Sequence, residues 1–303
     1  MSFLWSKLFP LVLGIAIVTP ASAKPLRVSW TPHSIASGSP CLFQVRSASS
    51  LSSLRGTWQG HEIVFSPQNH VWYGLGGVDL EAKPGSYRLE LNGTLANGKP
   101  IRAQFTVPVH PAKYKTEALT VPLRFVEPDA AALRVIAVDR KLKDAAFSHQ
   151  TTESEWSGDF IPPIDTTVSE GFGTRRTFNG KLASIHRGLD YHAKPGTPIA
   201  ASNSGQVVLA RELYYEGNCV FIDHGEGFMT IYMHLSRIDV HDGEKVEKGQ
   251  EIGLSGATGR ATGPHLHVSA RWQGAYLDPT QLWALPLPNL QAPAAARTRA
   301  GNR

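Results

Sequence analysis

Apolar and polar residues alternate in short runs over the first third of the chain. In residues 86–91 the side chains at every second position, Tyr87, Leu89 and Leu91, fall on one face of a strand. The hairpin signal Asn97-Gly98 follows, and the alternation then resumes over 101–107. Several short strands at this spacing predict a β-sandwich-like domain over residues 24–110.

A second strand-rich region covers residues 161–285. Three alternating runs, 206–213, 219–223 and 228–235, are separated by turns that contain Gly217 and Gly225. This order predicts an antiparallel meander. We therefore expect a mostly β protein, in which the sandwich-like domain precedes an antiparallel β-sheet domain.

The segments between and after these domains have a different composition. Residues 111–160 read as a connector, and Pro128 followed by Asp129 opens a helix within it. The polar stretch 150–159 is expected to be flexible. Residues 286–303 are rich in Pro, Ala and Arg, and they predict a disordered tail.

The first 23 residues have the pattern of a secretory signal peptide. Lys7 precedes the apolar run 8–19, and Ala21-Ser22-Ala23 forms a small-x-small cleavage site. The apolar run is too short to span a bilayer, which takes about 20 residues. We therefore expect an exported protein, in the periplasm or else outside the cell or at the cell wall, with no membrane span after cleavage.

Charge and cysteine content narrow the possible functions. Lysine and arginine number 30 against 25 acidic residues, and no dense basic run occurs, so nucleic acid is not an expected partner. Cys41 and Cys219 lie in strand-like runs of different domains. They are too few for a thiolate metal site, and two buried free thiols are favoured over a disulfide.

Candidate chemistry gathers in the second domain, where 7 of the 12 histidines lie between His186 and His267. In His186-Arg187-Gly188-Leu189-Asp190 the two ends are four residues apart, and therefore project to one side of a strand. In His265-Leu266-His267 the two rings face the same way only on a strand, because on a helix they diverge by about 200°. His234 stands at the end of a further expected strand.

These five residues are candidates for a metal centre. Catalytic zinc takes three protein ligands and keeps a position for water, so spacing alone leaves five candidates for three places. Three other histidines have weaker claims. His224 lies in a turn that favours a structural role, His192 shares the face of Asp190 or lies on a loop surface, and His241 is expected to be exposed.

The order of these motifs resembles that of the lysostaphin/LytM-type zinc endopeptidases. The resemblance spans Ser169 to Trp283 and rests on the following matched segments: Gly171-Phe172-Gly173, 186–191, 196–199, 222–225, 232–236, Lys248-Gly249-Gln250, 256–259 and 263–267. The region before it resembles, more loosely, an all-β domain found ahead of some periplasmic members of that family.

The resemblance implies a function and a role for each candidate. It implies that His186, Asp190 and His267 hold one Zn²⁺ ion, and that His234 and His265 flank the attacking water and the oxyanion. It also implies a groove across the sheet, and substrates among the peptide stems and cross-links of peptidoglycan, cut by a metal-activated water. The alternatives are a non-catalytic peptidoglycan-binding or amidase-activator protein, and a peptidase for glycine-rich proteins.

Overall fold

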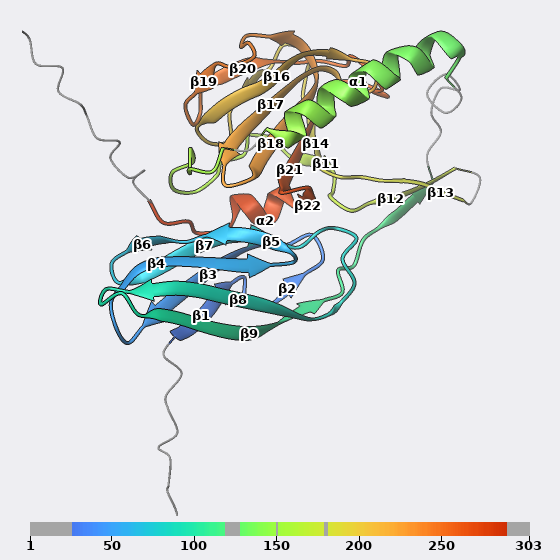
Figure 1. Ribbon diagram of the computed structural model, residues 1–303. Helices are drawn as coiled ribbons and strands as arrows, with labels where there is room; N and C mark the ends of the chain where they lie inside the picture. Colours follow the sequence, from blue (N-terminus) through green and yellow to red (C-terminus); the bar gives the residue numbers. More distant parts are fainter. Residues whose placement is uncertain (1–25, 119–127, 150, 179–180, 290–303) are drawn as a thin grey trace, which may run out of the picture.

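The structure is a computed structural model that describes residues 26–118, 128–149, 151–178 and 181–289 (Figure 1). The mostly β architecture expected from the sequence is confirmed, with an N-terminal β region and a C-terminal antiparallel sheet. The predicted signal peptide and residues 290–303 of the predicted tail lie outside the described residues. Leu287, within the segment expected to be a disordered tail, is buried, and its N–H donates to Asp159 Oδ1 at 2.6 Å.

Two sheets form the N-terminal sandwich. The first has the order β1 (Leu26–Thr31), β3 (Pro40–Ser47), β7 (Val71–Gly77), β6 (Ser66–Gln68). The second has the order β2 (Ile35–Ala36), β9 (Pro100–His110), β8 (Gly85–Leu95), β4 (Leu51–Trp58), β5 (His61–Val64). Along β8, Leu89 and Leu91 are buried while Arg88 and Glu90 are exposed, so the alternation in the sequence separates core from solvent.

The C-terminal domain is built on one large sheet. Its strands follow the order β11 (Val168–Glu170), β14 (Leu189–His192), β21 (His265–Trp272), β18 (Phe228–Ile238), β17 (Gly217–Gly225), β16 (Gly205–Leu213), β19 (Lys245–Val246). Three more strands join it at the sides: β15 (Pro198–Ala200), β20 (Glu251–Ser255) and β22 (Ala275–Leu277). The predicted meander is present, since β16, β17 and β18 are antiparallel neighbours.

The two faces of this sheet bury different side chains. Leu189 and Tyr191 of β14 point into one hydrophobic core, together with Leu266 and Val268 of β21. The helix α1 (Ala130–Ser148) covers part of the opposite face, where Ala146 packs into a second core formed with residues of β16, β17 and β18. The side chains of β14 and β21 that alternate with the buried ones emerge on this opposite face.

The connector is held more firmly than its composition suggests. Asp129 caps α1 by accepting a hydrogen bond from Ala132 N at 2.8 Å. Within the polar stretch expected to be flexible, Thr151 donates to the buried carboxylate of Asp223 through both its N–H and its hydroxyl, and Trp156 is 2% exposed. The expectation of a flexible stretch is wrong over these residues, because a buried acid and an aromatic side chain anchor them.

No helix in the described part of the chain combines the length and hydrophobicity that crossing a lipid bilayer requires. The two helices there are α1 and the short α2 (Pro279–Trp283), which begins after the capping residue Asp278. Both Cys41 and Cys219 are buried and unpaired, and burial raises the pKa of each thiol.

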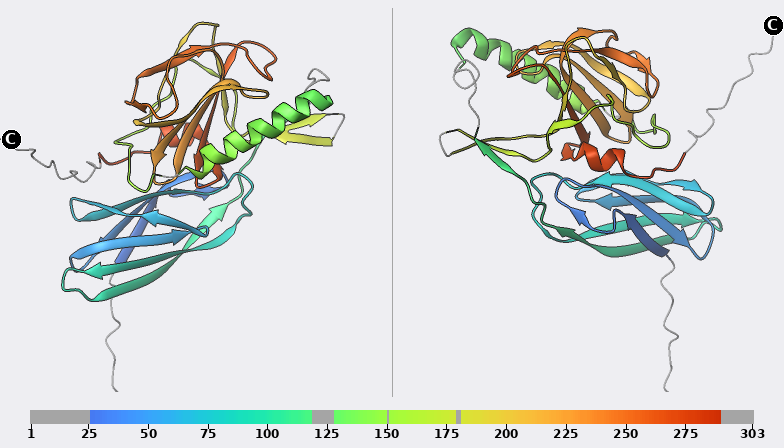
Figure 2. Two further views of the ribbon diagram at one scale, coloured as in Figure 1. Left: turned by 45° about the horizontal axis from the view of Figure 1, so that its top comes forward. Right: turned by 180° about the vertical axis from the view of Figure 1, so that it is seen from behind.

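The sandwich and the C-terminal domain share one hydrophobic core. Trp272 and Leu277, from β21 and β22, are fully buried among sandwich residues that include Phe43 and Trp58. The helix α2 lies between the two bodies in Figure 1 and in the right view of Figure 2. The sandwich therefore packs against the end of β21 that carries Trp272, whereas His265 and His267 stand at the other end.

A small sheet links the two parts on one side. In it β10 (Thr116–Ala118) pairs in parallel with β12 (Arg175–Phe178), which forms a hairpin with β13 (Lys181–Ile185). Figure 1 shows this hairpin extending from the body of the protein below α1. The chain leaves β13 directly before His186, so this hairpin sets the approach to the first candidate residue.

Candidate functional site

Three candidate residues converge from three places in the chain. His186 follows β13, Asp190 lies in β14, and His267 lies in β21, where it is the direct register partner of Asp190. Asp190 and His267 point away from the core because their strand neighbours point into it. Gly188 lets the loop pass against His267, since a Cβ at this position would collide with the imidazole ring.

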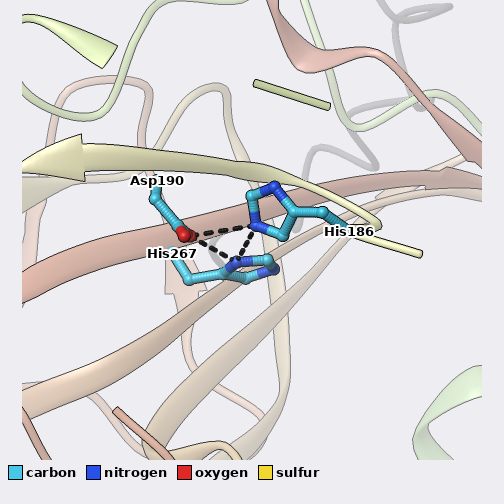
Figure 3. Close-up of side chains that lie close together, drawn as sticks. All are labelled: His186, Asp190 and His267. Carbon is cyan, nitrogen blue, oxygen red and sulfur yellow. Dashed lines mark hydrogen bonds and ion pairs between the residues drawn. The ribbon is translucent and has the colours of Figure 1, made fainter. Parts of the chain in front are cut away.

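The ligand-type atoms of these residues lie very close together (Figure 3). His186 Nε2 is 3.1 Å from Asp190 Oδ1 and 3.0 Å from His267 Nδ1, and His267 Nδ1 is 2.8 Å from Asp190 Oδ1. His186 and Asp190 are buried and His267 is half-buried. Ligand atoms on a tetrahedral zinc ion with bonds of about 2.0–2.1 Å would lie roughly 3.3 Å apart, which is close to the observed spacing.

The outward nitrogen of each imidazole has its own partner. His186 Nδ1 lies 2.9 Å from Gly171 O, and because a carbonyl only accepts, Nδ1 carries the proton and Nε2 presents a lone pair. His267 Nε2 lies 2.9 Å from Ser269 Oγ, which can accept its N–H. Two lone pairs and a carboxylate that face one another repel unless a cation stands between them, so the donor set fits a divalent metal.

The carboxylate of Asp190 is held from both sides. Burial raises its pKa, but the adjoining imidazoles of His186 and His267 outweigh burial and hold the pKa well below its usual range. Its Oδ2 lies 3.4 Å from Arg176 Nη2, and that guanidinium also binds Glu170 at 3.0 Å and 2.5 Å. Asp190 is therefore a charged acceptor at neutral pH.

Sequence reasoning missed the three residues that support this cluster, Arg176, Glu170 and Ser269. Arg176 lies on β12 and Glu170 on β11, and no spacing rule relates either residue to Asp190. The only sequence signal was Ser269 itself, two positions after His267 on the same strand and therefore on the same face.

His265 and His234 stand beside the cluster. His265 lies on the same face of β21 as His267, and its Nε2 is 3.9 Å from Asp190 Oδ1 while Nδ1 lies 2.8 Å from Gly263 O. The rings of His234 and His265 are 4.7 Å apart between centroids, and those of His234 and His267 are 6.2 Å apart. All five candidate residues therefore come together.

His234 differs from expectation in its backbone. It does not end a strand but lies inside β18, where the pairing with β17 shifts register, and its φ is 64°. The left-handed backbone is strained for a non-glycine residue, and such bulges re-aim side chains. Its N–H donates to Glu216 O at 2.9 Å and its Nδ1 lies 2.9 Å from Thr258 O, so both ends of the residue are fixed.

Burial and neighbouring charge keep His234 neutral. Burial lowers its pKa, and repulsion from His267 and His265 adds to this effect, so the pKa falls to about 3. Because Nδ1 donates to the carbonyl of Thr258, the neutral ring presents Nε2 as a hydrogen-bond acceptor. His234 is therefore a neutral hydrogen-bond acceptor beside the cluster.

The helix α1 supports the turn that holds His234. Lys143 pairs with Glu216 at 2.6 Å, and Asp139, which is buried, accepts from Tyr214 N at 2.7 Å. A helix from the connector thus fixes the turn between β16 and β17 that binds the His234 backbone. No local pattern predicts this contact, because the helix and the turn are more than 70 residues apart in the sequence.

The three weaker histidine candidates contribute no ligand-type atom to the cluster. His224 is fully buried, with Nδ1 2.7 Å from Ser204 O and Nε2 2.7 Å from Thr230 Oγ1, so its role is structural as the turn context favoured. His192 is exposed and pairs in register with His265. His241 is exposed and lies 2.8 Å from Glu244.

Comparison with known proteins shows what the region that contains these residues is similar to. Residues 184–279 match the family described as Peptidase family M23. The peptidoglycan DD-endopeptidase ShyA of Vibrio cholerae is 44% identical over 123 residues, which are 40% of this chain and 26% of that protein. The DD-carboxypeptidase/endopeptidase Mpg of Neisseria meningitidis is 41% identical over 136 residues, 45% of this chain and 31% of that protein.

One solved structure resembles most of the chain. A Pseudomonas aeruginosa protein, solved as a candidate M23 peptidase, aligns with a TM-score of 0.62 and 27% identity, and covers 82% of this chain and 94% of that one. By contrast, the chain spans only about a quarter to a third of the length of the curated relatives named above, 26% and 31%. The sequence similarity to those relatives therefore covers less than half of this chain, whereas the structural likeness extends over the sandwich as well.

Proposed function

Because the chain belongs to peptidase family M23 through its C-terminal domain, we propose that it is a zinc-dependent endopeptidase that hydrolyses peptide cross-links of peptidoglycan. The observation that carries this proposal is the convergence of His186, Asp190 and His267 with two further histidines on one face of the sheet. The related endopeptidases named above support the choice of substrate. Such a substrate places the protein in the cell envelope, and we propose the periplasm.

His186, Asp190 and His267 would hold the metal. When bound, a zinc ion supplies Lewis acidity, which lowers the pKa of a water molecule and polarises the scissile carbonyl. Two imidazoles and one carboxylate suit zinc, and three protein ligands leave a place for water and substrate. Gly171 and Ser269 fix the two imidazoles, and Arg176 fixes the carboxylate, so the donor atoms are oriented in advance.

His234 and His265 would move the proton. Each ring has Nδ1 engaged by a backbone carbonyl, so each presents Nε2 toward the space in front of the cluster. A neutral Nε2 accepts the proton of the attacking water, and a protonated Nε2 donates to the carbonyl oxygen or to the leaving amine. The 4.7 Å between the two rings lets both act on one substrate amide.

Digestion of purified cross-linked wall tests the proposal. Wild type loaded with zinc is expected to convert cross-linked muropeptide dimers to monomers, each cleavage releasing one free amine that mass spectrometry detects. His265→Ala is expected to retain the metal and lose this activity, since His265 is not among the three ligands. His241→Ala is the matched control, because His241 is exposed, pairs with Glu244 and takes no part in the cluster, so this variant should remain active.

Two outcomes would contradict the proposal. Equal release of monomers by wild type and by His265→Ala would show that His265 and the face of the sheet that carries it are not catalytic. Zinc binding with no loss of dimers would instead favour a non-catalytic wall-binding protein that has kept the ligand set.

A further inference from the structure

Arg260 lies in the loop between β20 and β21 and is held against the turn that supports His234. Its N–H donates to Tyr215 O at 2.9 Å, and its guanidinium lies over the ring of Tyr215, 4.5 Å from the centroid. A guanidinium stacked on an aromatic face is pre-oriented, because its plane is fixed while its N–H groups remain directed outward. The side chain is exposed, so a ligand can reach it.

Two residues close to Arg260, Thr258 and Glu216, bind His234 and so place Arg260 at the candidate active site. Thr258, two residues earlier, accepts the hydrogen bond from His234 Nδ1, and Glu216, next to Tyr215, accepts from His234 N. Arg260 also lies close enough to Arg176 for their two positive charges to repel each other, and Arg176 Nη2 is itself 3.4 Å from Asp190 Oδ2. Arg260 therefore belongs to the rim of the cluster.

Arg260 forms no ion pair with an acidic side chain among the described residues. Arg176 is bound by Glu170 and Asp190, and Glu216 pairs with Lys143 at 2.6 Å. Among the residues that the structure describes, no carboxylate forms an ion pair with Arg260. A stacked, oriented cation without an acidic partner at the edge of a catalytic site is suited to a carboxylate of the substrate.

Building on the proposed endopeptidase function, we propose that Arg260 binds a substrate carboxylate next to the amide that is cut, and so determines specificity. In a cross-link from D-alanine to diaminopimelate, the carbon that bears the scissile nitrogen also bears a free carboxylate. A glycine bridge has no carboxylate at the corresponding carbon. Arg260 therefore selects the first type of cross-link over the second.

Binding to two matched probes tests this role without turnover. The probes are synthetic D-alanyl-diaminopimelate peptides that differ only in whether the carboxyl beside the scissile nitrogen is free or amidated. Calorimetry is done on the full zinc-loaded chain carrying His265→Ala. The free carboxylate is expected to bind about tenfold tighter or more, the value of one charge-assisted hydrogen bond.

Three substitutions in this background separate recognition from structure. Arg260→Gln is expected to bind the two probes equally, and Arg260→Lys to keep a reduced preference, because it retains the charge but loses the planar fork. Arg102→Gln removes an exposed arginine of the sandwich, and should keep the full preference. The hydrogen bond from the backbone N–H of residue 260 to Tyr215 O involves no side chain, so every variant retains this contact between the loop and the turn.

The result that overturns the inference is an equal affinity of the parent protein for both probes, or an equal loss for both in Arg260→Gln, as a purely structural arginine would give. Cleavage of the free-carboxylate probe by the otherwise wild-type chain is measured in parallel. Absence of cleavage contradicts the proposed function alone, because the binding preference is read independently of it.

Discussion

Ser269→Ala tests whether the contacts behind the ligand set matter for metal binding. Ser269 is 1% exposed and its hydroxyl lies 2.9 Å from His267 Nε2, on the far side of the ring from Asp190. Alanine leaves that ring N–H buried without an acceptor, which costs about 1–3 kcal/mol. The zinc dissociation constant is therefore expected to rise by about tenfold to a hundredfold.

The assay is competition for zinc with a chromophoric chelator at neutral pH. Ser202→Ala is the matched control, because Ser202 is also fully buried in this domain but its hydroxyl has no hydrogen-bond partner in the described structure. Its zinc affinity should equal that of wild type. If Ser269→Ala binds zinc as tightly as wild type and Ser202→Ala do, the argument that Ser269 orients His267 is refuted.

Three further predictions concern stability. Chelating the metal should lower the Tm of wild type but not that of His267→Ala, because only wild type loses a cation between repelling donors; equal drops would contradict this. Burial lowers the pKa of His224 from 6.5 to about 4, so the unfolded chain takes up the proton first. The free energy of unfolding therefore has its full value above pH 6.5 and falls by about 3 kcal/mol as the pH is lowered toward 4. Urea titrations should show a smaller pH dependence of this free energy in His224→Gln. Leu277→Ala should lower the free energy of unfolding by about 2–5 kcal/mol, and calorimetry of wild type should show one transition for both domains; two separate transitions would contradict a shared core.

The candidate site could be predicted from the sequence because its residues form short motifs within single strands and loops. In His265-Leu266-His267 and in the spacing from His186 to Asp190, strand geometry alone places the side chains on one face, and the flanking Leu189 and Leu266 show which face is buried. Spacing could not choose three ligands among five residues. Of these five, His186, Asp190 and His267 have ligand-type atoms within 4.8 Å of one another, which supports our proposal that they hold the metal.

The features that the sequence did not reveal all depend on contacts between distant segments. Arg176 reaches Asp190 from a separate hairpin, and the strained backbone of His234 depends on the turn at Glu216. The polar composition of residues 151–159 suggested flexibility because the buried acceptor Asp223 lies more than 70 residues away. Likewise, an apolar Trp272 predicts burial but does not indicate that a different domain buries it.

The most direct test of the central claim is anomalous diffraction at the zinc edge from crystals of the full chain grown with zinc. The account predicts one strong peak within bonding distance of His186 Nε2, Asp190 Oδ1 and His267 Nδ1, and no such peak in His267→Ala. A wild-type crystal with no peak there, or with its zinc bound by other residues, would contradict the account.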